Sequence, residues 1–274
     1  MPSGAARTRS RRSPLAGRAR KPGAQSGRRL DERVVEEGLA ESRNRARALI
    51  LSGVVLVDDV PVDKVGQRVS PEAAIRLKGG APPRFVSRGG EKLAGALEDL
   101  GVDPAGRVCL DVGASTGGFT DCLLQAGATR VIAVDVGHGQ LHSRLRADAR
   151  VVAHERVNAR ELAPEHVGEP VALVVADVSF ISLRLLLPRF VSVAPDADWL
   201  LLVKPQFEVG RERVGKGGVV RDDADRDAAV ASVVQAAEEH GYALVARVDS
   251  RLAGPRGNRE IFVLLRPREG ADRG

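Results

Sequence analysis

The sequence is poor in aromatic residues and in cysteine. Aromatic side chains make up 3% of its 274 residues, so the core must be built from Val, Leu, Ile and Ala. Only two cysteines occur, Cys109 and Cys122, and each lies among apolar residues without metal-ligand spacing. This excludes a disulfide framework and a cysteine-rich zinc site. We expect two buried free thiols, no bound metal and a cytoplasmic protein.

Long uncharged apolar runs are also missing. The N-terminus lacks the apolar segment of a signal peptide. The longest apolar run, VALVVADVSFISLRLLL at residues 171–187, is interrupted by Asp177 and Arg184. A membrane-spanning helix needs about 18 or more uncharged residues. The sequence therefore predicts no transmembrane helix and no membrane partner.

Positive charge is concentrated at the N-terminus. The chain has a net charge of +6, and residues 1–29 hold nine Lys and Arg and no acid, so the remainder carries −3. Residues 1–28 are also rich in Gly, Pro and Ser, and such a segment cannot bury enough apolar surface to fold. We predict a disordered basic tail. It could attract a polyanion or be only a solvated extension.

A small unit is predicted at residues 29–80. Apolar residues within 30–39 have helical spacing. Ser42 is suited to cap a second helix, which Gly53 would end. Residues 54–69 then alternate like short strands joined by turns.

A Gly/Pro-rich linker at 81–90 precedes a larger domain at 91–268. In this domain, continuous apolar strands alternate with helical patterns. The predicted strands are 107–113, 130–137, 149–157, 171–179, 198–207, 242–250 and 259–267. Such a pattern favours an α/β, Rossmann-like domain whose seven-stranded, mostly parallel sheet is covered on both faces. The last strand is expected to run antiparallel.

The most specific motif is LDVGASTGGFTDCLL, residues 110–124, between the first predicted strand of this domain and a helix. Ligands of open α/β sheets bind beyond the C-terminal ends of the strands. Gly113 allows a tight turn close to a ligand, and Gly117 and Gly118 begin a helix whose free N–H groups favour an anion. The form D-x-G-x-x-T-G-G resembles motif I of S-adenosylmethionine-dependent class I methyltransferases.

An acid follows at the end of the second strand. Asp135 lies 24 residues after Asp111 and could accept hydrogen bonds from both ribose hydroxyls of an adenosine, although NAD enzymes place an acid similarly. The resemblance implies S-adenosylmethionine as cofactor. The expected cofactor-binding residues are Asp111, Gly113, Ala114, Ser115, Thr116, Gly117, Gly118, Asp135, Val136 and Asp177.

Four polar residues, Asp177 among them, should meet at the same edge of the sheet. Asp177 and Lys204 end parallel strands, and Glu260 begins the antiparallel strand, whose start lies beside those ends. Lys92 lies at the head of a helix before the first strand. Taken singly, each could be a turn cap or a solvated strand end. The order Lys–Asp–Lys–Glu resembles the catalytic tetrad of FtsJ-like ribose 2′-O-methyltransferases, which implies that these four residues are catalytic.

The surrounding motifs resemble one branch of that group. SRGGEKL, DVGASTGGFTDCLL, ADVSFISL, VKPQFEVG, GKGGVVRD and GPRGNREIF, between residues 87 and 263, are similar to the TlyA family of rRNA methyltransferases, also labelled hemolysin A. RLDERVVEEGLAESRNRARALILSGVVLV resembles an S4 RNA-binding domain. The resemblance implies ribose 2′-O-methylation of cytidine in 16S rRNA, 23S rRNA or both, by a protein that we expect to be a monomer.

The chemistry demands a base. A ribose 2′-hydroxyl must lose its proton during methyl transfer, and Lys204 is the expected base. Its reference pKa is about 10.4. Burial and the charge of Lys92 would lower that pKa, whereas nearby carboxylates would raise it, and the sequence leaves this balance open. Positioning of the hydroxyl is a second source of rate.

RNA-binding residues are expected on the S4 unit, the linker and one loop. They are Arg29, Ser42, Arg43, Arg47, Arg84, Arg88 and Lys216. A solvated surface is the alternative for each arginine. Where S4 domains often have V-N-G, this chain has Val57-Asp58-Asp59, which disfavours a phosphate contact at that turn.

Lys216 lies in GRERVGKGG, residues 210–218. This segment is nearly a P-loop, but Gly217 stands where Ser or Thr would hold Mg²⁺. Because the phosphate cradle of this sheet is the motif at 110–124, we expect a substrate-side loop, ordered mainly when RNA binds, and no ATP or GTP.

Three other functions compete. Base-amine methyltransferases typically carry N/D-P-P-Y/F after the fourth strand, and residues 177–180 read DVSF, without the prolines. A membrane-active hemolysin is disfavoured, because the sequence predicts neither a membrane-spanning helix nor a signal peptide. A binding-only protein with an inactive methyltransferase fold is opposed by the intact loop and tetrad. Another RNA as substrate stays open.

Overall fold

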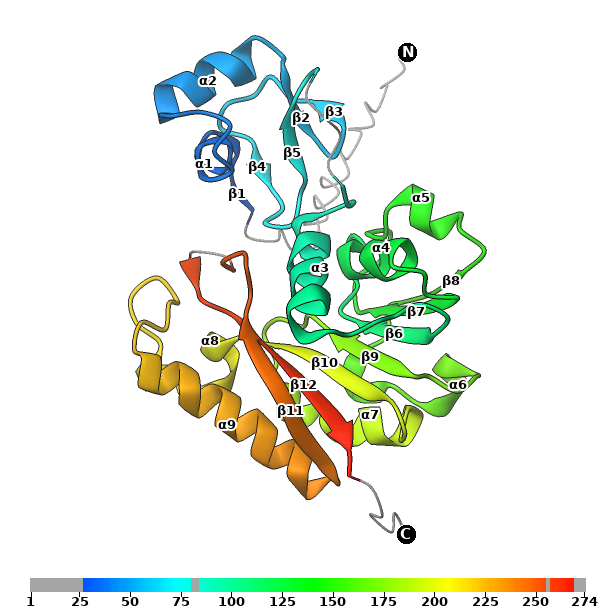
Figure 1. Cartoon of the computed structure of the whole chain (residues 1–274). Coiled ribbons are helices and arrows are strands. Elements are labelled where there is room, and N and C mark those ends of the chain that lie inside the picture. Colours follow the sequence, from blue (N-terminus) through cyan, green and yellow to red (C-terminus); the bar gives the residue numbers. More distant parts are fainter. Residues whose placement is uncertain (1–26, 80–83, 255–256, 269–274) are drawn as a thin grey trace, which may run out of the picture.

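The computed structural model describes residues 27–79, 84–254 and 257–268, and shows a small N-terminal domain above a larger α/β domain (Figure 1). Residues 1–26 of the predicted tail and 81–83 of the predicted linker lie outside the described residues. Arg28, which the sequence analysis assigned to the tail, pairs with Val69 in a two-stranded sheet.

The small domain combines two helices with short strands. Its elements are β1 (Arg28–Arg29), α1 (Leu30–Glu36), α2 (Arg43–Leu51), β2 (Val55–Val57), β3 (Val60–Pro61), β4 (Arg68–Val69) and β5 (Ile75–Leu77). The hydroxyl of Ser42 accepts a hydrogen bond from the Arg45 N–H and caps α2, as predicted. Leu30, Val34 and Ile50 are fully buried between the helices and the sheet, because helical spacing places them on the inner faces.

The turn at Asp58 and Asp59 is structural. Both residues have positive φ angles, 49° and 66°, as a type I′ hairpin requires at its two central positions. A carboxylate oxygen of Asp58 accepts a hydrogen bond from the Ala74 N–H, and Asp59 pairs with Arg76. Both acids thus have partners within the small domain, and the expectation that this turn does not contact phosphate stays a prediction.

The large domain is built on a seven-stranded sheet in the order β11-β12-β10-β9-β6-β7-β8. The strands are β6 (Val108–Val112), β7 (Arg130–Asp135), β8 (Val151–Glu155), β9 (Leu173–Ala176), β10 (Asp198–Val203), β11 (Tyr242–Asp249) and β12 (Ile261–Pro267). β6 to β10 pair in parallel, and β12 is antiparallel to both β10 and β11. The predicted fold is confirmed. The chain order reverses between β6 and β9, where open sheets form their ligand crevice.

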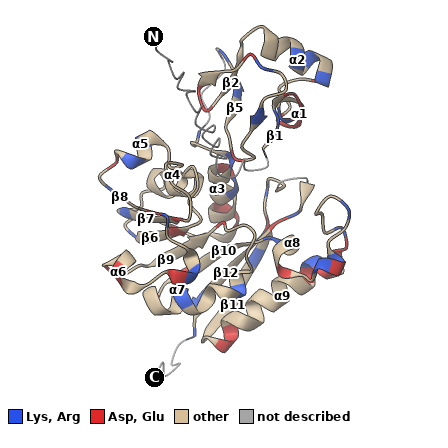
Figure 2. Ribbon diagram, turned by 180° about the vertical axis from the view of Figure 1, so that it is seen from behind, with Lys and Arg blue, Asp and Glu red and all other residues tan. Residues whose placement is uncertain are grey.

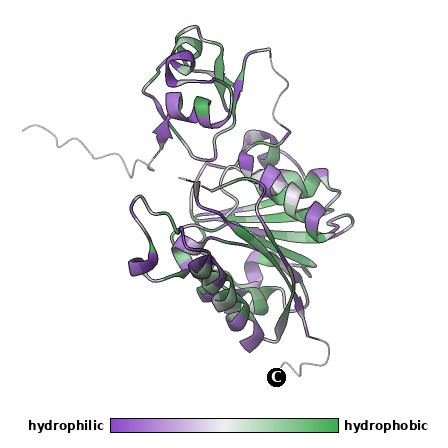
Figure 3. Ribbon diagram, turned by 60° about the vertical axis from the view of Figure 1, so that its left-hand side comes forward, coloured by the Kyte–Doolittle hydropathy of each residue, from purple (hydrophilic) through white to green (hydrophobic). Residues whose placement is uncertain are grey.

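Helices cover both faces of this sheet (Figure 3). They are α3 (Arg88–Leu100), α4 (Gly118–Gln125), α5 (Ser143–Arg146), α6 (Pro164–Val167), α7 (Leu187–Val193), α8 (Pro205–Glu208) and α9 (Asp223–Glu239), with short 3₁₀ turns η1 (Ala159–Glu161), η2 (Leu183–Leu185) and η3 (Arg211–Arg213). Neighbouring residues of β10 face opposite cores: Leu201 packs with α7 and α9, and Leu200 packs with α3 and α4. Within residues 27–79, 84–254 and 257–268, no helix could cross a membrane.

Candidate active site

The four predicted catalytic residues lie together at the C-terminal edge of the parallel strands. Asp177 follows β9, Lys204 follows β10, Glu260 precedes β12, and Lys92 lies in the second turn of α3. Lys204 Nζ is 2.6 Å from Asp177 Oδ1, and Lys92 Nζ donates to Glu260 Oε2 at 2.8 Å. Lys92, Lys204 and Glu260 are buried. The fold thus assembles one buried ion pair, Lys92–Glu260, and one largely buried pair, Lys204–Asp177, from four separate segments.

The two pairs influence each other's charge. Burial lowers the pKa of Lys92, but the nearby carboxylates of Asp177 and Glu260 outweigh it and hold that pKa above its ordinary value. Burial alone would raise the pKa of Asp177. The positive charges of Lys204 and Lys92 outweigh this effect, so the pKa of Asp177 lies below its ordinary value. The pKa of Glu260 is raised, chiefly by burial. Lys92 is therefore a fixed positive charge near neutral pH.

Lys204 has a further neighbour that the sequence analysis missed. Its Nζ donates to the hydroxyl of Ser179 at 2.8 Å. An ammonium has three donor positions, and Asp177 and Ser179 take two of them. The remaining position is available to a hydroxyl bound in the crevice.

The glycine turn lies directly beside this tetrad. Gly113 has φ = +89°, and a Cβ there would lie 2.7 Å from the carbonyl oxygen of Asp177. Gly117 has φ = +96°, and a Cβ would collide with Leu145. Both positions need glycine for two reasons, the backbone angle and the close approach of a neighbour. At Gly118, a Cβ would collide with the Ser87 hydroxyl, so this glycine also serves the packing of α4 against α3.

Asp111 is a buried acid beneath the turn. Its Oδ2 accepts from the Thr120 hydroxyl at 2.6 Å, while its Oδ1 has no hydrogen-bond partner among the described residues. Burial is the main reason that the pKa of Asp111 is raised to about 7. The hydroxyl of Thr116 in the turn is likewise buried and unbonded within the described part of the chain. Both groups are thus buried polar atoms that lack a hydrogen-bond partner among the described residues.

Asp135 joins the two loops at the end of the crevice. Its Oδ2 accepts from the Ser115 N–H at 2.9 Å, and its Oδ1 accepts from the Gly137 N–H at 2.6 Å. The next residue, Val136, is exposed. Each carboxylate oxygen keeps further lone pairs, so Asp135 can orient both loops and still accept from hydroxyl groups of a ligand.

Lys and Arg are spread over both domains (Figure 2), and the predicted RNA-binding residues fall into separate places. Arg29 and Arg43 meet at Asp31. Arg88 begins α3 and pairs across the domain boundary with Glu37 at 3.3 Å. Arg47 and Lys216 are exposed on α2 and on the loop after η3. The hydroxyl of Ser42 is engaged in capping α2.

The loop that holds Lys216 has structure of its own. η3 begins it, Gly215 pairs with Val219, and the Asn258 side chain bonds to Gly218 and Val220. These contacts could not be predicted from the sequence, because Asn258 lies 40 residues from Gly218. That the segment becomes ordered mainly when RNA binds stays a prediction.

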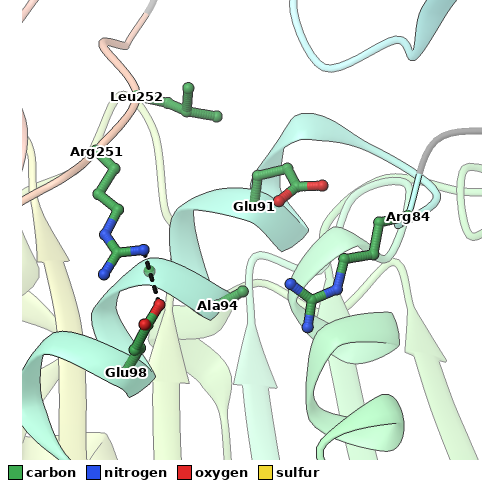
Figure 4. A pocket seen from close by; sticks show the side chains of 7 residues that line it. Arg84, Glu91, Ala94, Glu98, Arg251 and Leu252 are labelled. Carbon is green, nitrogen blue, oxygen red and sulfur yellow. Dashed lines mark hydrogen bonds and ion pairs between the residues drawn. The ribbon is translucent and has the colours of Figure 1, made fainter.

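A cleft of about 380 Å³ lies between the domains and reaches the tetrad. Arg28 and Glu72 of the small domain line it, together with Arg88, Lys92 and Gly254 of the large domain. A second depression, of about 600 Å³, lies along α3 and is lined by Arg84, Glu91 and Arg251 among others (Figure 4). It contains no tetrad residue. There, Arg251, which lies shortly after β11, pairs with Glu98 and Asp99 of α3.

Sequence reasoning also missed Phe180. Its side chain is 88% exposed and its φ is +67°, an unusual angle for a bulky residue. Its ring centroid is 5.3 Å from that of Phe207. The available signal was its place in DVSF, where base methyltransferases carry an aromatic residue. Phe180 is therefore an exposed aromatic residue at a strained backbone position, three residues after Asp177.

The strand order, the glycine turn after β6 and the acid at the end of β7 define a class I, Rossmann-like methyltransferase domain, which follows the small N-terminal domain. Two family models match the chain: the FtsJ-like methyltransferase over residues 85–267 and the S4 domain over residues 28–75. The chain belongs to the FtsJ-like methyltransferase family and, within it, to the TlyA branch.

Relatives cover nearly the whole chain. A Mycobacterium tuberculosis protein named 16S/23S rRNA (cytidine-2′-O)-methyltransferase TlyA is 51% identical over 87% of this chain and 89% of its own. Hemolysin A of Brachyspira hyodysenteriae is 41% identical over 85% of this chain and 98% of its own length. A solved Streptococcus thermophilus structure described as a hemolysin has a TM-score of 0.74 and 36% identity over 90% of both chains. These matches confirm the family resemblance.

Proposed function

We propose that the protein transfers the methyl group of S-adenosylmethionine to the ribose 2′-hydroxyl of a cytidine in ribosomal RNA. The observation that carries this proposal is the pairing of Lys204 with Asp177 and of Lys92 with Glu260 beside the glycine turn. The names of the relatives supply the nucleotide and the RNA, in the small subunit, the large subunit or both.

The residues around the turn fit the cofactor. S-adenosylmethionine supplies an electrophilic methyl group when bound. Gly113 and Gly117 leave room for close approach, Asp135 can accept from its ribose hydroxyls, and the exposed Val136 can cover an adenine ring. The unbonded Asp111 Oδ1 and Thr116 Oγ1 provide polar contacts for its amino-acid part.

The two lysines take different roles. Lys92 is held charged by two carboxylates and positions substrate oxygen. Lys204 acts as the neutral amine: its two N–H groups donate to Asp177 and Ser179, and its lone pair takes the proton from the 2′-hydroxyl. Asp177 and Glu260 orient the lysines and balance their charge. A bound hydroxyl held in line with the methyl group gains further rate from positioning.

The target nucleotide must be presented outside its stack. A 2′-hydroxyl within folded RNA reaches a buried site only when its nucleotide is turned out. Phe180, backed by Phe207, offers its base an aromatic surface. The S4 domain (29–80), the linker (81–90) and the methyltransferase domain (91–268) would place the RNA across the interdomain cleft, with the tail at 1–28 as an added polycation. We propose that the protein acts as a monomer in the cytoplasm.

The test uses purified protein, radiolabelled S-adenosylmethionine and intact subunits or naked rRNA. We expect label in a cytidine ribose, lost in Lys204→Ala and Asp177→Ala. Arg189→Ala, an exposed change on α7, is the control that retains labelling. Label in a base would support a base methyltransferase. Lysis of erythrocytes without any RNA labelling would favour the hemolysin function.

A further inference from the structure

One buried acid of the small domain holds two of its arginines. Asp31 lies in the first turn of α1, and its side chain is 2% exposed. Its Oδ1 accepts from Arg29 Nε at 2.9 Å, and its Oδ2 accepts from Arg29 Nη2 at 3.2 Å. The same Oδ2 accepts from Arg43 Nη2 at 3.0 Å. A single carboxylate thus joins an arginine of β1 to the first residue of α2.

The bonds fix the two guanidinium groups without burying them. Arg29 is gripped by two parallel bonds, the geometry that matches a planar guanidinium to a carboxylate. The side chains of Arg29 and Arg43 stay 42% and 56% exposed. Each guanidinium has five N–H donors, so both keep donors that face solvent while the acid lies behind them.

We infer that Asp31 is a positioning residue that presents Arg29 and Arg43 as a paired site for the phosphodiester backbone of RNA. The inference rests on the proposed function, since it assumes an RNA substrate. Its value lies in preorganisation: two long side chains lose little freedom on binding when a buried acid already holds them. Burial raises the pKa of Asp31, but the bonds from Arg29 and Arg43 outweigh it, so the acid stays ionised.

Neighbouring charges distinguish this site from a plain basic patch. Glu32 lies 3.4 Å from Arg43 Nη2 and is far more exposed than Asp31. The two arginines and two acids sum to zero charge, so net charge alone gives no attraction to RNA. Arg47 is exposed on the same helix, and no hydrogen bond or ion pair to its side chain occurs in the described residues.

Substitutions of Asp31 and Glu32 therefore distinguish a positioning role of an acid from a purely electrostatic one. If acids here acted only through charge, removing either would bring RNA closer and tighten binding. A positioning role predicts opposite signs. Asp31→Asn should weaken binding because the guanidinium groups lose their anchor, whereas Glu32→Gln should tighten it because a competitor of phosphate is gone.

The experiment measures the Kd of the full chain for the ribosomal subunit or rRNA that the wild type methylates, over a range of salt. We expect Asp31→Asn to raise Kd about tenfold, on the scale of one charge-assisted contact, and Glu32→Gln to lower it about two- to threefold. The KM for RNA should rise in Asp31→Asn while kcat at saturating RNA stays unchanged. Unchanged or tighter binding by Asp31→Asn would overturn the inference.

A second comparison tests whether Asp31→Asn acts through the two arginines or by disturbing the fold of the small domain. In an Arg29→Ala/Arg43→Ala background, Asp31→Asn should not weaken binding further, because nothing is left to position. A further loss there would mean that Asp31 acts through the fold. Arg47→Ala should weaken binding less than Arg43→Ala. If the wild type itself neither binds nor methylates rRNA, the proposed function fails instead.

Discussion

Lys92 Nζ lies 2.8 Å from Glu260 Oε2, although the two residues are 168 positions apart. Both side chains are almost fully buried. The pair connects α3 to Glu260, the residue directly before the closing strand β12. Because a buried charge without its partner is costly, this contact links the stability of the domain to the assembly of the tetrad.

Glu260→Gln should destabilise the fold by about 3 kcal/mol, because it leaves the Lys92 charge with Asp177 alone. The double variant Lys92→Met/Glu260→Leu should recover most of that loss while methyl transfer stays absent. Urea unfolding and the labelling assay measure the two effects separately. Equal stability of Glu260→Gln and the wild type would contradict this account.

Gly113→Ala should impair cofactor binding. The new Cβ would lie 2.7 Å from the Asp177 carbonyl oxygen, at a φ of +89°. Gly101→Ala is the matched control, since its φ is +63° but no atom lies within 4 Å of the new Cβ. Both changes should cost about 1–3 kcal/mol of backbone strain, and only Gly113→Ala should lose affinity for S-adenosylmethionine in calorimetry. Equal affinities would mean that the close approach is unimportant.

Phe180→Ala should lower kcat/KM for rRNA without destabilising the fold. Stacking of one base on an aromatic ring contributes about 1–3 kcal/mol, so kcat/KM for rRNA should fall about 5- to 150-fold. Leu185→Ala removes another exposed apolar side chain, 54% exposed and on η2 nearby, and should change kcat/KM little. Thermal unfolding should be unaltered in both. A similar loss in the two variants would argue for a general apolar contact.

The sequence predicted well what depends on local pattern. The apolar runs end at Asp177 and Lys204, and parallel strands bring such ends together, so the tetrad could be placed on one edge before any coordinates. The same reasoning reached the turn at Gly113. Helix capping by Ser42 followed from its position before an apolar periodic segment.

Contacts between distant elements could not be predicted. The exposure and positive φ of Phe180 depend on the path of the loop after β9, which no local pattern specifies. Arg29 and Arg43 were chosen for their charge, but only the packing of α1 against α2 brings both to Asp31. Gly118 was assigned to the cofactor from its motif, and its closeness to Ser87 depends on how α3 crosses α4.

Asp111 predicts a pH dependence of stability. Its pKa is raised to about 7, chiefly by burial, whereas an unfolded chain has an Asp pKa of about 3.9. Between these values the folded state binds the proton more strongly than the unfolded state, so this residue makes stability fall as pH rises. Asp111→Asn keeps an acceptor for Thr120 and removes the titration. Without cofactor, the stability of the wild type relative to Asp111→Asn should therefore decrease from pH 5 to pH 8. Urea unfolding of both proteins at the two pH values measures this difference, and an increase would mean that an unseen partner stabilises the ionised carboxylate.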